Sequence, residues 1–283
     1  MARALKPPSV KLPAKLPAKI HKPHLPHLPD PNEPDVFEEM TLLEHMEELR
    51  DRIVKTCIGI GVTFIVGLFL AVPLLHYMKI AANAERGFQI LSPTEPLTLY
   101  MKVALYIAIA IAMPLIVWQF MGFLAPGLTN KEKRILLGSL PFVTVLFFLG
   151  AAYAFFVAAP KALWFLSNLF TDLIDWSPQG DEVVNFYLTL MVGLGLAFEL
   201  PVIMFLLAKL GVVTPAKMKH FRKFAFLAII VIAAVITPTT DPFNLSLVAI
   251  PLALLYEIGV WTSYFFVKRS TRDHTEPPAA AAD

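Results

Sequence analysis

Residues 183–209 read VVNFYLTLMVGLGLAFELPVIMFLLAK, an apolar run that contains one carboxylate, Glu199. A bilayer core about 30 Å thick requires about 20 apolar residues in a helix that crosses it. This run of 27 residues is long enough and therefore predicts a membrane-spanning helix. Five further apolar runs occupy residues 53–75, 97–123, 139–159, 224–236 and 245–267.

The composition of the 283-residue chain agrees with this interpretation. Hydrophobic residues make up 57% and charged residues 16%, whereas soluble domains have roughly 45–50% and about 25%. Too few charges remain to cover a soluble surface of this size, which disfavours a soluble single-domain enzyme. The formal net charge of +2 disfavours nucleic-acid binding driven by bulk charge. The single cysteine, Cys57, excludes a disulfide within the chain and a cysteine-cluster metal site.

The composition divides the chain into three regions. Residues 1–34 hold nine of the 24 prolines, and proline at this density prevents helices and sheet ladders, so we expect a disordered arm. Its three histidines, at positions 21, 24 and 27, alternate with prolines that prevent the helix needed to align them, so we expect no metal site there. Residues 35–267 are predicted to form an all-α membrane domain, and residues 268–283 a disordered cytoplasmic tail.

The number of spans and their orientation follow from length and charge. The run at 224–236 extends roughly 20 Å as a helix, but basic residues precede it and a polar turn follows. We therefore interpret it as a short spanning helix, which gives six spans. Lysine and arginine are enriched in cytoplasmic loops, and 19 of the 24 lie on the side that carries both termini, against three in the opposite loops. Both termini are therefore predicted to be cytoplasmic.

Two carboxylates lie inside predicted spans. A charged carboxylate at the bilayer centre costs about 2.5–3.5 kcal/mol on insertion scales. Glu199 is therefore expected to face protein or water, or to carry a proton, and it can serve either as a bridge between helices or in a transport path. Glu257 lies nearer the cytoplasmic end of its helix, and for it we favour a structural pair with a neighbouring helix.

Further acids are predicted to face the cytoplasm. Glu132 stands in a basic loop, where Thr129 or Asn130 can cap the following helix and place Glu132 in its first turn. Capping and local ion pairs are a sufficient explanation for this residue. The amphipathic helix before the first span carries a second acidic group over residues 44–51. Two separated carboxylates on one cytoplasmic face can receive a cationic peptide.

Five short motifs follow one another along the chain: HMEELR at 45–50, FLAPGLTNKEKR at 123–134, FELP at 198–201, TPTTD at 237–241 and YEIGV at 256–260. In this order they resemble the TatC family, the receptor and core subunit of the twin-arginine protein translocase. The resemblance covers about residues 40–267. It implies a concave, glove-shaped bundle of six helices, of which the fifth and sixth are short.

The resemblance also implies which residues bind. It places a cytoplasmic site for the arginine pair of a signal peptide at Glu48, Arg50, Phe123, Pro126, Leu128 and Glu132. Glu199 is implied to contact a partner helix or the inserted signal, and Pro73 and Asp241 match functional positions on the far side. The family commonly has glutamine shortly after this aspartate, where the chain has Leu245 preceded by Asn244. This difference leaves the polar contact at that corner open.

The predicted function is that of a non-enzymatic translocase subunit in a bacterial-type cytoplasmic (inner) membrane, without a cofactor. It is expected to bind the twin-arginine signal peptides of folded precursors and, with single-span partners of the TatA and TatB types, to support their export driven by the proton-motive force. Homo- and hetero-oligomers are expected. A guanidinium group can meet Glu48 or Glu132 with two parallel hydrogen bonds, which lysine cannot reproduce.

Two alternatives remain open from the sequence. The first is a small proton-coupled secondary transporter in which Glu199 or Glu257 titrates. The second is an intramembrane hydrolase that uses Asp241, although no paired motif accompanies this residue. The sequence contains no phosphate-binding loop, zinc-protease helix or nucleophile elbow.

Overall fold

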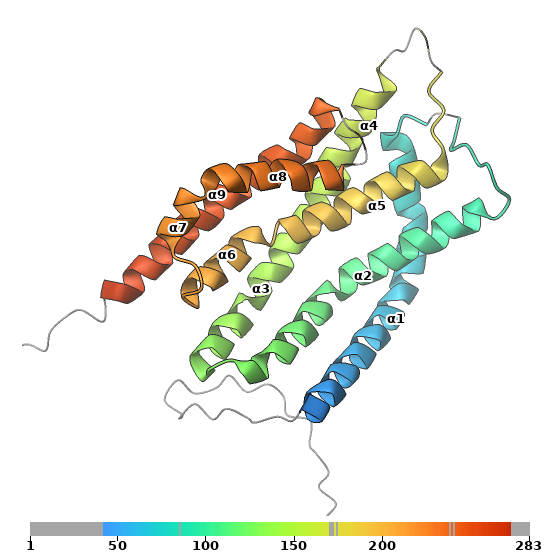
Figure 1. The fold of residues 1–283 in the computed structure, drawn as a ribbon. Coiled ribbons are helices and arrows are strands. Elements are labelled where there is room, and N and C mark those ends of the chain that lie inside the picture. Colours follow the sequence, from blue (N-terminus) through green and yellow to red (C-terminus); the bar gives the residue numbers. More distant parts are fainter. Residues whose placement is uncertain are drawn as a thin grey trace, which may run out of the picture.

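The computed structural model describes residues 42–272, apart from residues 85, 170–172, 174, 238 and 240. The predicted N-terminal arm and the last eleven residues of the predicted tail lie outside this part of the chain. The described residues form an almost entirely helical molecule, and their one β-type contact is a single bridge between Gln89 and Gln179. Figure 1 shows the long helices side by side, with the start of α1 and the end of α9 both in the lower part of the view.

Five helical stretches are long and apolar enough to cross a membrane: Leu43–Ala81, Glu95–Gly127, Asn130–Ser167, Gly180–Lys209 and Pro242–Phe265. They contain α1 (Leu42–Ala81), α2 (Glu95–Leu124), α3 (Asn130–Tyr153), α4 (Ala159–Ser167), α5 (Gly180–Ala197), α6 (Leu200–Lys209) and α9 (Pro242–Arg272). Two shorter helices, α7 (Pro215–His220) and α8 (Arg222–Ile236), precede α9. The all-α bundle predicted from the sequence is confirmed.

The fifth and sixth predicted spans differ from each other in length. The fifth is α8, whose 15 residues reach roughly 22 Å and so remain shorter than a bilayer core. The prediction of a short sixth helix is wrong, because α9 has 31 residues and continues to Arg272. Pro251 lies inside α9 without ending it.

The first two long helices pack closely along their length. Gly67 of α1 makes this approach possible, since a Cβ atom there would lie 2.2 Å from the carbonyl oxygen of Ala104 in α2. Hydrogen bonds cross the same contact, from Thr63 Oγ1 to the carbonyl oxygen of Ala108 and from Tyr100 to that of Leu68. The bend of α1 in its second half (Figure 1) lies in the part that contains Pro73, which lacks the amide hydrogen for a helical hydrogen bond.

Two of the membrane stretches are interrupted. Between α3 and α4 the chain forms a π-helical turn over Ala154–Ala158, directly before Pro160. Such turns accommodate a residue that cannot donate a helical hydrogen bond. Between α5 and α6 the helix breaks at Phe198 and Glu199, and Pro201 stands in the first turn of α6. The break places the Glu199 side chain at a helix start inside the membrane stretch.

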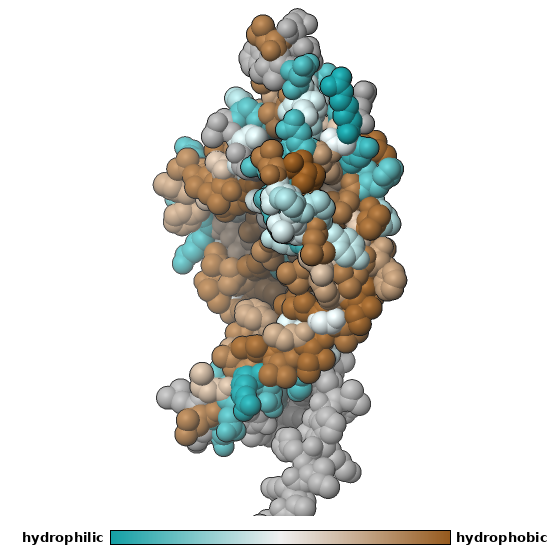
Figure 2. Space-filling model, turned by 90° about the vertical axis from the view of Figure 1, so that its right-hand side faces the viewer, coloured by the Kyte–Doolittle hydropathy of each residue, from teal (hydrophilic) through white to brown (hydrophobic). Residues whose placement is uncertain are grey.

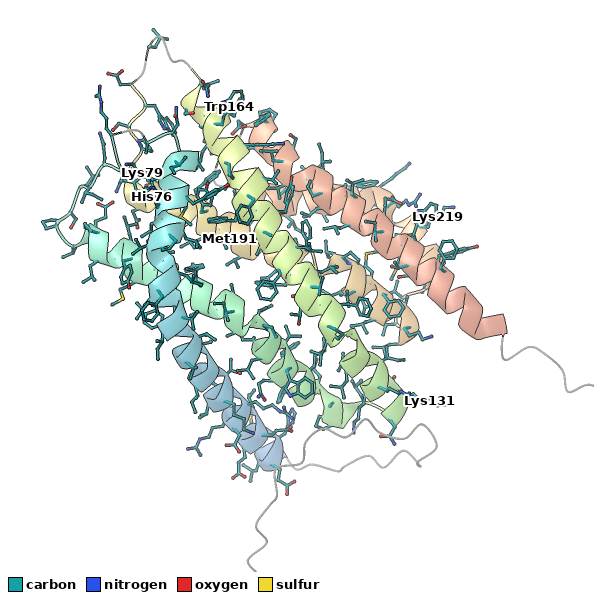
Figure 3. All side chains as sticks on the ribbon, turned by 180° about the vertical axis from the view of Figure 1, so that it is seen from behind. His76, Lys79, Lys131, Trp164, Met191 and Lys219 are labelled. Carbon is teal, nitrogen blue, oxygen red and sulfur yellow. The ribbon has the colours of Figure 1, made fainter. Side chains whose placement is uncertain are left out.

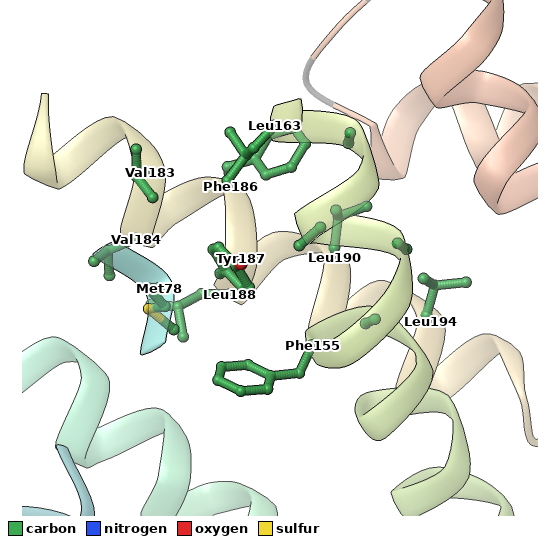
Figure 4. Packing of buried hydrophobic residues seen from close by; sticks show 14 of the residues in the cluster. Met78, Phe155, Leu163, Val183, Val184, Phe186, Tyr187, Leu188, Leu190 and Leu194 are labelled. Carbon is green, nitrogen blue, oxygen red and sulfur yellow. The ribbon is translucent and has the colours of Figure 1, made fainter. Parts of the chain in front are cut away.

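The largest buried cluster joins α1, α2, α4, α5, α8, α9 and the π-helical turn. Tyr187 and Leu194 of α5 are fully buried in it, together with Met78 of α1 (Figure 4). The outer surface is also apolar: Phe69 is 77% exposed and Val235 is 78% exposed. Figure 2 shows hydrophobic residues in a broad band with hydrophilic residues gathered above and below it, as expected when lipid, not water, surrounds the helices.

The two far-side loops are tied to each other. The buried carboxylate of Glu95 accepts hydrogen bonds from the amides of Leu91 (2.8 Å), Ser92 (3.3 Å) and Asp181 (3.3 Å). The indole of Trp176 donates to the carbonyl oxygen of Ala82 at 2.7 Å. These contacts hold the start of α5 against the loop that precedes α2.

Candidate functional site

The cytoplasmic candidate site is built around Glu48, in the second turn of α1. Its Oε1 atom accepts hydrogen bonds from Arg52 Nε at 2.9 Å and Arg52 Nη2 at 2.5 Å, one helical turn further along. Arg52 Nη1 also reaches Gln119 Oε1 of α2 at 3.4 Å. Because Glu48 and Arg52 are only 21% and 23% exposed, water screens this pair less than it screens a surface ion pair.

The second oxygen of Glu48 is available. Glu48 Oε2 is buried and accepts no hydrogen bond from any described residue; His45 Nδ1 lies 3.9 Å from it. The imidazole ring of His45 stacks on the ring of Phe123, with ring centres 4.3 Å apart. The structure therefore brings two predicted site residues, Glu48 and Phe123, together through a histidine that the sequence analysis did not assign to the site.

A small apolar cavity adjoins this group. Its volume is about 210 Å³, and Arg52, Gln119, Phe120 and Phe123 contribute to its lining. Glu48 itself does not line the cavity, but Arg52, which binds it, does. A hollow with aromatic walls can receive a guanidinium group, whose flat face stacks on aromatic rings.

Glu132 lies in the first turn of α3 and closes a capping box. Its Oε2 atom accepts from the amide of Thr129 at 2.8 Å, and its own amide donates to Thr129 Oγ1 at 3.4 Å. The capping expected from the sequence is therefore present. Pro126 lies in the 3₁₀ turn Ala125–Gly127, and the half-buried Leu128 packs on the apolar cluster between α2 and α3. These residues give the loop a fixed shape next to the end of α2.

Arg50 does not join the group, since its side chain is exposed on α1. The arginine that contacts Glu48 is Arg52, and the four-residue spacing from Glu48 is the signal that could have identified it, because such residues face each other on a helix. Gln119 had no comparable signal, as its contact depends on how α1 packs against α2.

Glu199 lies directly before the first residue of α6. Its backbone oxygen accepts from the amides of Val202 and Ile203, both at 3.0 Å. Its Oε1 atom is buried and has no hydrogen-bond partner among the described residues. The neighbouring Phe198 packs on Tyr153 of α3, with ring centres 5.9 Å apart. Glu199 thus presents a polar atom without a partner within the membrane stretch.

Glu257 pairs with a neighbouring helix, as favoured from the sequence. Its Oε2 atom accepts from Arg222 Nη2, at the start of α8, at 2.6 Å. The adjacent Tyr256 donates to the carbonyl oxygen of Met218 in α7 at 2.8 Å. These bonds attach the short helices to α9, so Glu257 has a structural role.

The far-side corner before α9 keeps a polar contact. Asp241 accepts from the amide and the side-chain amide of Asn244, each at 2.8 Å, and Asn244 also donates to Thr239 Oγ1 at 3.0 Å. Asn244 is buried, whereas Leu245 packs on the main apolar cluster. An asparagine one position before the expected glutamine therefore makes the contact. Pro73, the other predicted far-side residue, is exposed on α1 and takes no part in the hydrogen bonds of Asp241 and Asn244.

Within the described residues, no group of three histidine, cysteine or carboxylate side chains is arranged to hold a metal ion. The structure is that of a multi-pass helical membrane protein. It has an acidic, partly buried group of side chains at the end predicted to be cytoplasmic and, within a membrane stretch, the Oε1 atom of Glu199, which has no partner among the described residues. The model of the family described as "Sec-independent protein translocase protein (TatC)" matches residues 44–251. The chain belongs to the TatC family.

Similar proteins agree with this assignment. The chain is 35% identical over 227 residues to the Sec-independent protein translocase protein TatCy of Bacillus subtilis (strain 168), covering 80% of this chain and 89% of that protein. It is 38% identical over 246 residues to TatC of Aquifex aeolicus (strain VF5), covering 84% of this chain and 98% of that protein.

Two crystal structures of the twin arginine translocase receptor TatC, one of them in DDM, have the same fold. Their TM-scores are 0.66 and 0.68 at 35% and 36% identity, covering 78% of this chain and 99% of each structure. The chain is therefore a multi-pass inner-membrane component of a Sec-independent protein translocase complex, from a family of receptors that are not enzymes. These comparisons give no support to the alternative of a proton-coupled transporter.

Proposed function

We propose that the cytoplasmic ends of α1, α2 and α3 form the receptor site for the arginine pair of a twin-arginine signal peptide. Glu48 and Glu132 supply the two carboxylates, and Phe123, Pro126 and Leu128 supply the apolar surroundings. Arg50, exposed on the same helix, borders the site. The observation that carries this proposal is the buried Oε2 atom of Glu48, which has no donor among the described residues. Arg52, which binds the other oxygen of Glu48, lines the aromatic-walled hollow.

Arg52 has a positioning role in this proposal. Its two hydrogen bonds to Oε1 hold the carboxylate of Glu48 in one orientation, which leaves Oε2 as the oxygen that can accept from an incoming guanidinium. The capping box does the same for Glu132, whose Oε2 is held by the amide of Thr129. Both carboxylates are therefore fixed before the signal peptide binds, which lowers the entropy lost on binding.

The site favours arginine over lysine for a geometric reason. A guanidinium fork can bond a carboxylate and stack on an aromatic ring at the same time, whereas an ammonium group acts as a point charge. A fully exposed ion pair contributes only about 0–1 kcal/mol. Useful discrimination therefore requires two pairs that are partly removed from water, and the half-buried Glu48 meets this condition.

Glu199 supplies the second part of the proposal. An unpartnered carboxyl oxygen within the membrane stretch gives a polar contact to a transmembrane helix that carries a hydrogen-bonding side chain. We infer that this helix belongs to the inserted signal or to a single-span partner of the TatA or TatB type. With such partners the chain supports export of folded precursors driven by the proton-motive force.

Site-specific photo-crosslinking tests the proposal in the complete membrane complex. A photoreactive residue at position 128 should crosslink to a precursor with an Arg-Arg signal. One that replaces the exposed Lys219 should not. The crosslink at 128 should fall when the signal carries Lys-Lys or when the receptor carries Glu48→Gln and Glu132→Gln. Equal crosslinks at both positions, or a crosslink unaffected by these changes, would contradict the receptor site.

A further inference from the structure

An apolar groove lies between α3, α6 and α9, and none of its lining residues belongs to the candidate receptor site. Its volume is about 500 Å³, and Phe142 and Leu146 of α3, Phe205 of α6 and Ile258 of α9 contribute to its walls. Along α3 its lining extends from Arg134 to Leu146, roughly 18 Å at the helical rise per residue. One leaflet of the bilayer core is about 15 Å deep, so the groove has the length of one leaflet.

Two cations stand at the cytoplasmic end of this groove. Arg134 lies near the start of α3 and Lys209 is the last residue of α6, and both line the groove. Neither has an ion pair with a described residue. The groove therefore joins an apolar channel to a positively charged mouth on the side where the lysine and arginine residues of the chain gather.

The hydroxyl groups of the groove wall already donate their hydrogens within their own helix. Ser139 donates to the carbonyl oxygen of Leu136, and Thr262 donates to the backbone of its own helix at Ile258. Gly138 has no side chain, and a Cβ atom added there would have no neighbour within 4 Å. Along its length the groove thus suits a hydrocarbon chain, with polar recognition confined to the mouth.

We propose that this groove is a binding site for an anionic phospholipid of the cytoplasmic leaflet. The headgroup phosphate lies between Arg134 and Lys209, and one acyl chain follows the groove toward Leu146. Basic pockets between transmembrane helices on the cytoplasmic side are suited to anionic headgroups. The arginine pair of a signal peptide would be repelled by the two cations.

Electron paramagnetic resonance of spin-labelled lipids tests this proposal with the full chain in phosphatidylcholine vesicles. Spin-labelled phosphatidylglycerol should associate with the protein more strongly than spin-labelled phosphatidylcholine. Changing both Arg134 and Lys209 to glutamine should lower this preference, by up to about fivefold for each charge removed. Gly138→Phe should lower it with both charges in place, because the new ring fills the groove.

Matched controls separate the site from general charge and bulk. Lys217→Gln with Lys219→Gln removes two exposed cytoplasmic charges from α7, and Gly61→Phe adds the same ring at an open position of α1. Both controls should keep the preference. A preference that survives the groove variants, or falls equally in the controls, overturns the proposal.

A test for a helix in the groove completes the experiment. Cysteine at position 142 should not crosslink to a single-span partner or to a second copy of the chain in the assembled complex. If position 142 does crosslink and the protein shows no preference for phosphatidylglycerol, the groove is a helix-docking surface and the proposal of a lipid site is wrong. Neither outcome affects the receptor site, which lies on other residues.

Discussion

At the scale of single residues, the proposed receptor site depends on a carboxylate oxygen that has no hydrogen-bond donor among the described residues. Glu48 gives one oxygen to Arg52 and retains the other, buried and without a donor. Leaving a buried acceptor unsatisfied costs about 1–3 kcal/mol. In the proposed receptor site, a signal arginine that donates to this oxygen would remove that cost.

The position of Arg52 can be tested without changing a charge. In Gly122→Ala the new Cβ atom would lie 2.2 Å from Arg52 Nη1, so the guanidinium must move and Glu48 loses its fixed orientation. We expect the affinity for an Arg-Arg signal peptide to fall about fivefold, which corresponds to about 1 kcal/mol for one weakened hydrogen bond. Isothermal titration with the purified protein measures this.

Gly61→Ala is the control for this change, since a Cβ atom there has no neighbour within 4 Å. It should bind the peptide as the parent does. An unchanged affinity in Gly122→Ala would show that Arg52 does not position Glu48.

The residue scale also shows which contacts the sequence could predict. The capping box at Glu132 was foreseeable, because threonine followed three residues later by glutamate is a local pattern. For Glu257 the sequence predicted that a partner exists, since a carboxylate in a span requires one. It did not identify Arg222 as that partner. The bond from Arg52 to Gln119 and that from Asn244 to Thr239 depend on packing and on turn geometry, which no local pattern specifies.

At the scale of elements, the short helix α8 depends on its attachment to α9. Its 15 residues are too few for a full crossing, and its buried side chains, Ile229 and Ala233, pack in the same apolar cluster as α9. The ion pair between Arg222 and Glu257 connects the start of α8 to the middle of α9. The short α8 was predicted from the length of its apolar run. The full length of α9 was not, because its last residues are polar and basic and do not extend the apolar pattern.

The pair between α8 and α9 makes a stability prediction. Glu257→Ala should lower the free energy of unfolding by about 1–3 kcal/mol, because Arg222 then remains half-buried without its partner. Thermal unfolding in detergent, followed by circular dichroism, measures this. The double change Arg222→Met with Glu257→Met should recover part of the loss, since no unpaired charge remains. A double variant less stable than Glu257→Ala would refute this account of the pair.

The far-side loops make a second stability prediction. Glu95→Gln removes the charge that accepts from three backbone amides and leaves only one side-chain oxygen. We expect a loss of about 1–3 kcal/mol in the free energy of unfolding. Faster proteolysis of the loop before α2 should accompany it.

Glu182→Gln is the matched control, because this exposed acid lies in the first turn of α5 beside the same loops. It should change stability little. Equal losses in the two variants would mean that general charge, not the bonds of Glu95, stabilises this face.

At the scale of the whole molecule, the distribution of charge specifies how the bundle sits in the membrane. Lys131 lies at the opposite end of the molecule from His76, Lys79 and Trp164 (Figure 3). The sequence predicts the orientation, because positive residues gather on one side. The pairing of α1 with α2 was not predictable from charge, because it depends on close backbone contact. The break between α5 and α6 was predictable from Pro201, which lacks the amide hydrogen for a helical hydrogen bond.

Cysteine labelling tests this orientation. Single cysteines at positions 131 and 219, in a Cys57→Ser background, should react with an impermeant maleimide only when the cytoplasmic side is accessible. Cysteines at positions 79 and 164 should react from the opposite side. Labelling of position 131 and position 79 from the same side would refute the orientation.

The central claim is that Glu48 and Glu132 together read the arginine pair. The most direct measurement is the affinity of the purified protein for an Arg-Arg signal peptide relative to its Lys-Lys counterpart, in the parent, in Glu48→Gln with Glu132→Gln, and in the exposed control Glu47→Gln. Two partly desolvated pairs predict a preference of roughly tenfold to thirtyfold in the parent and control, and about none in the double variant. A double variant that keeps the full preference for Arg-Arg would contradict the account.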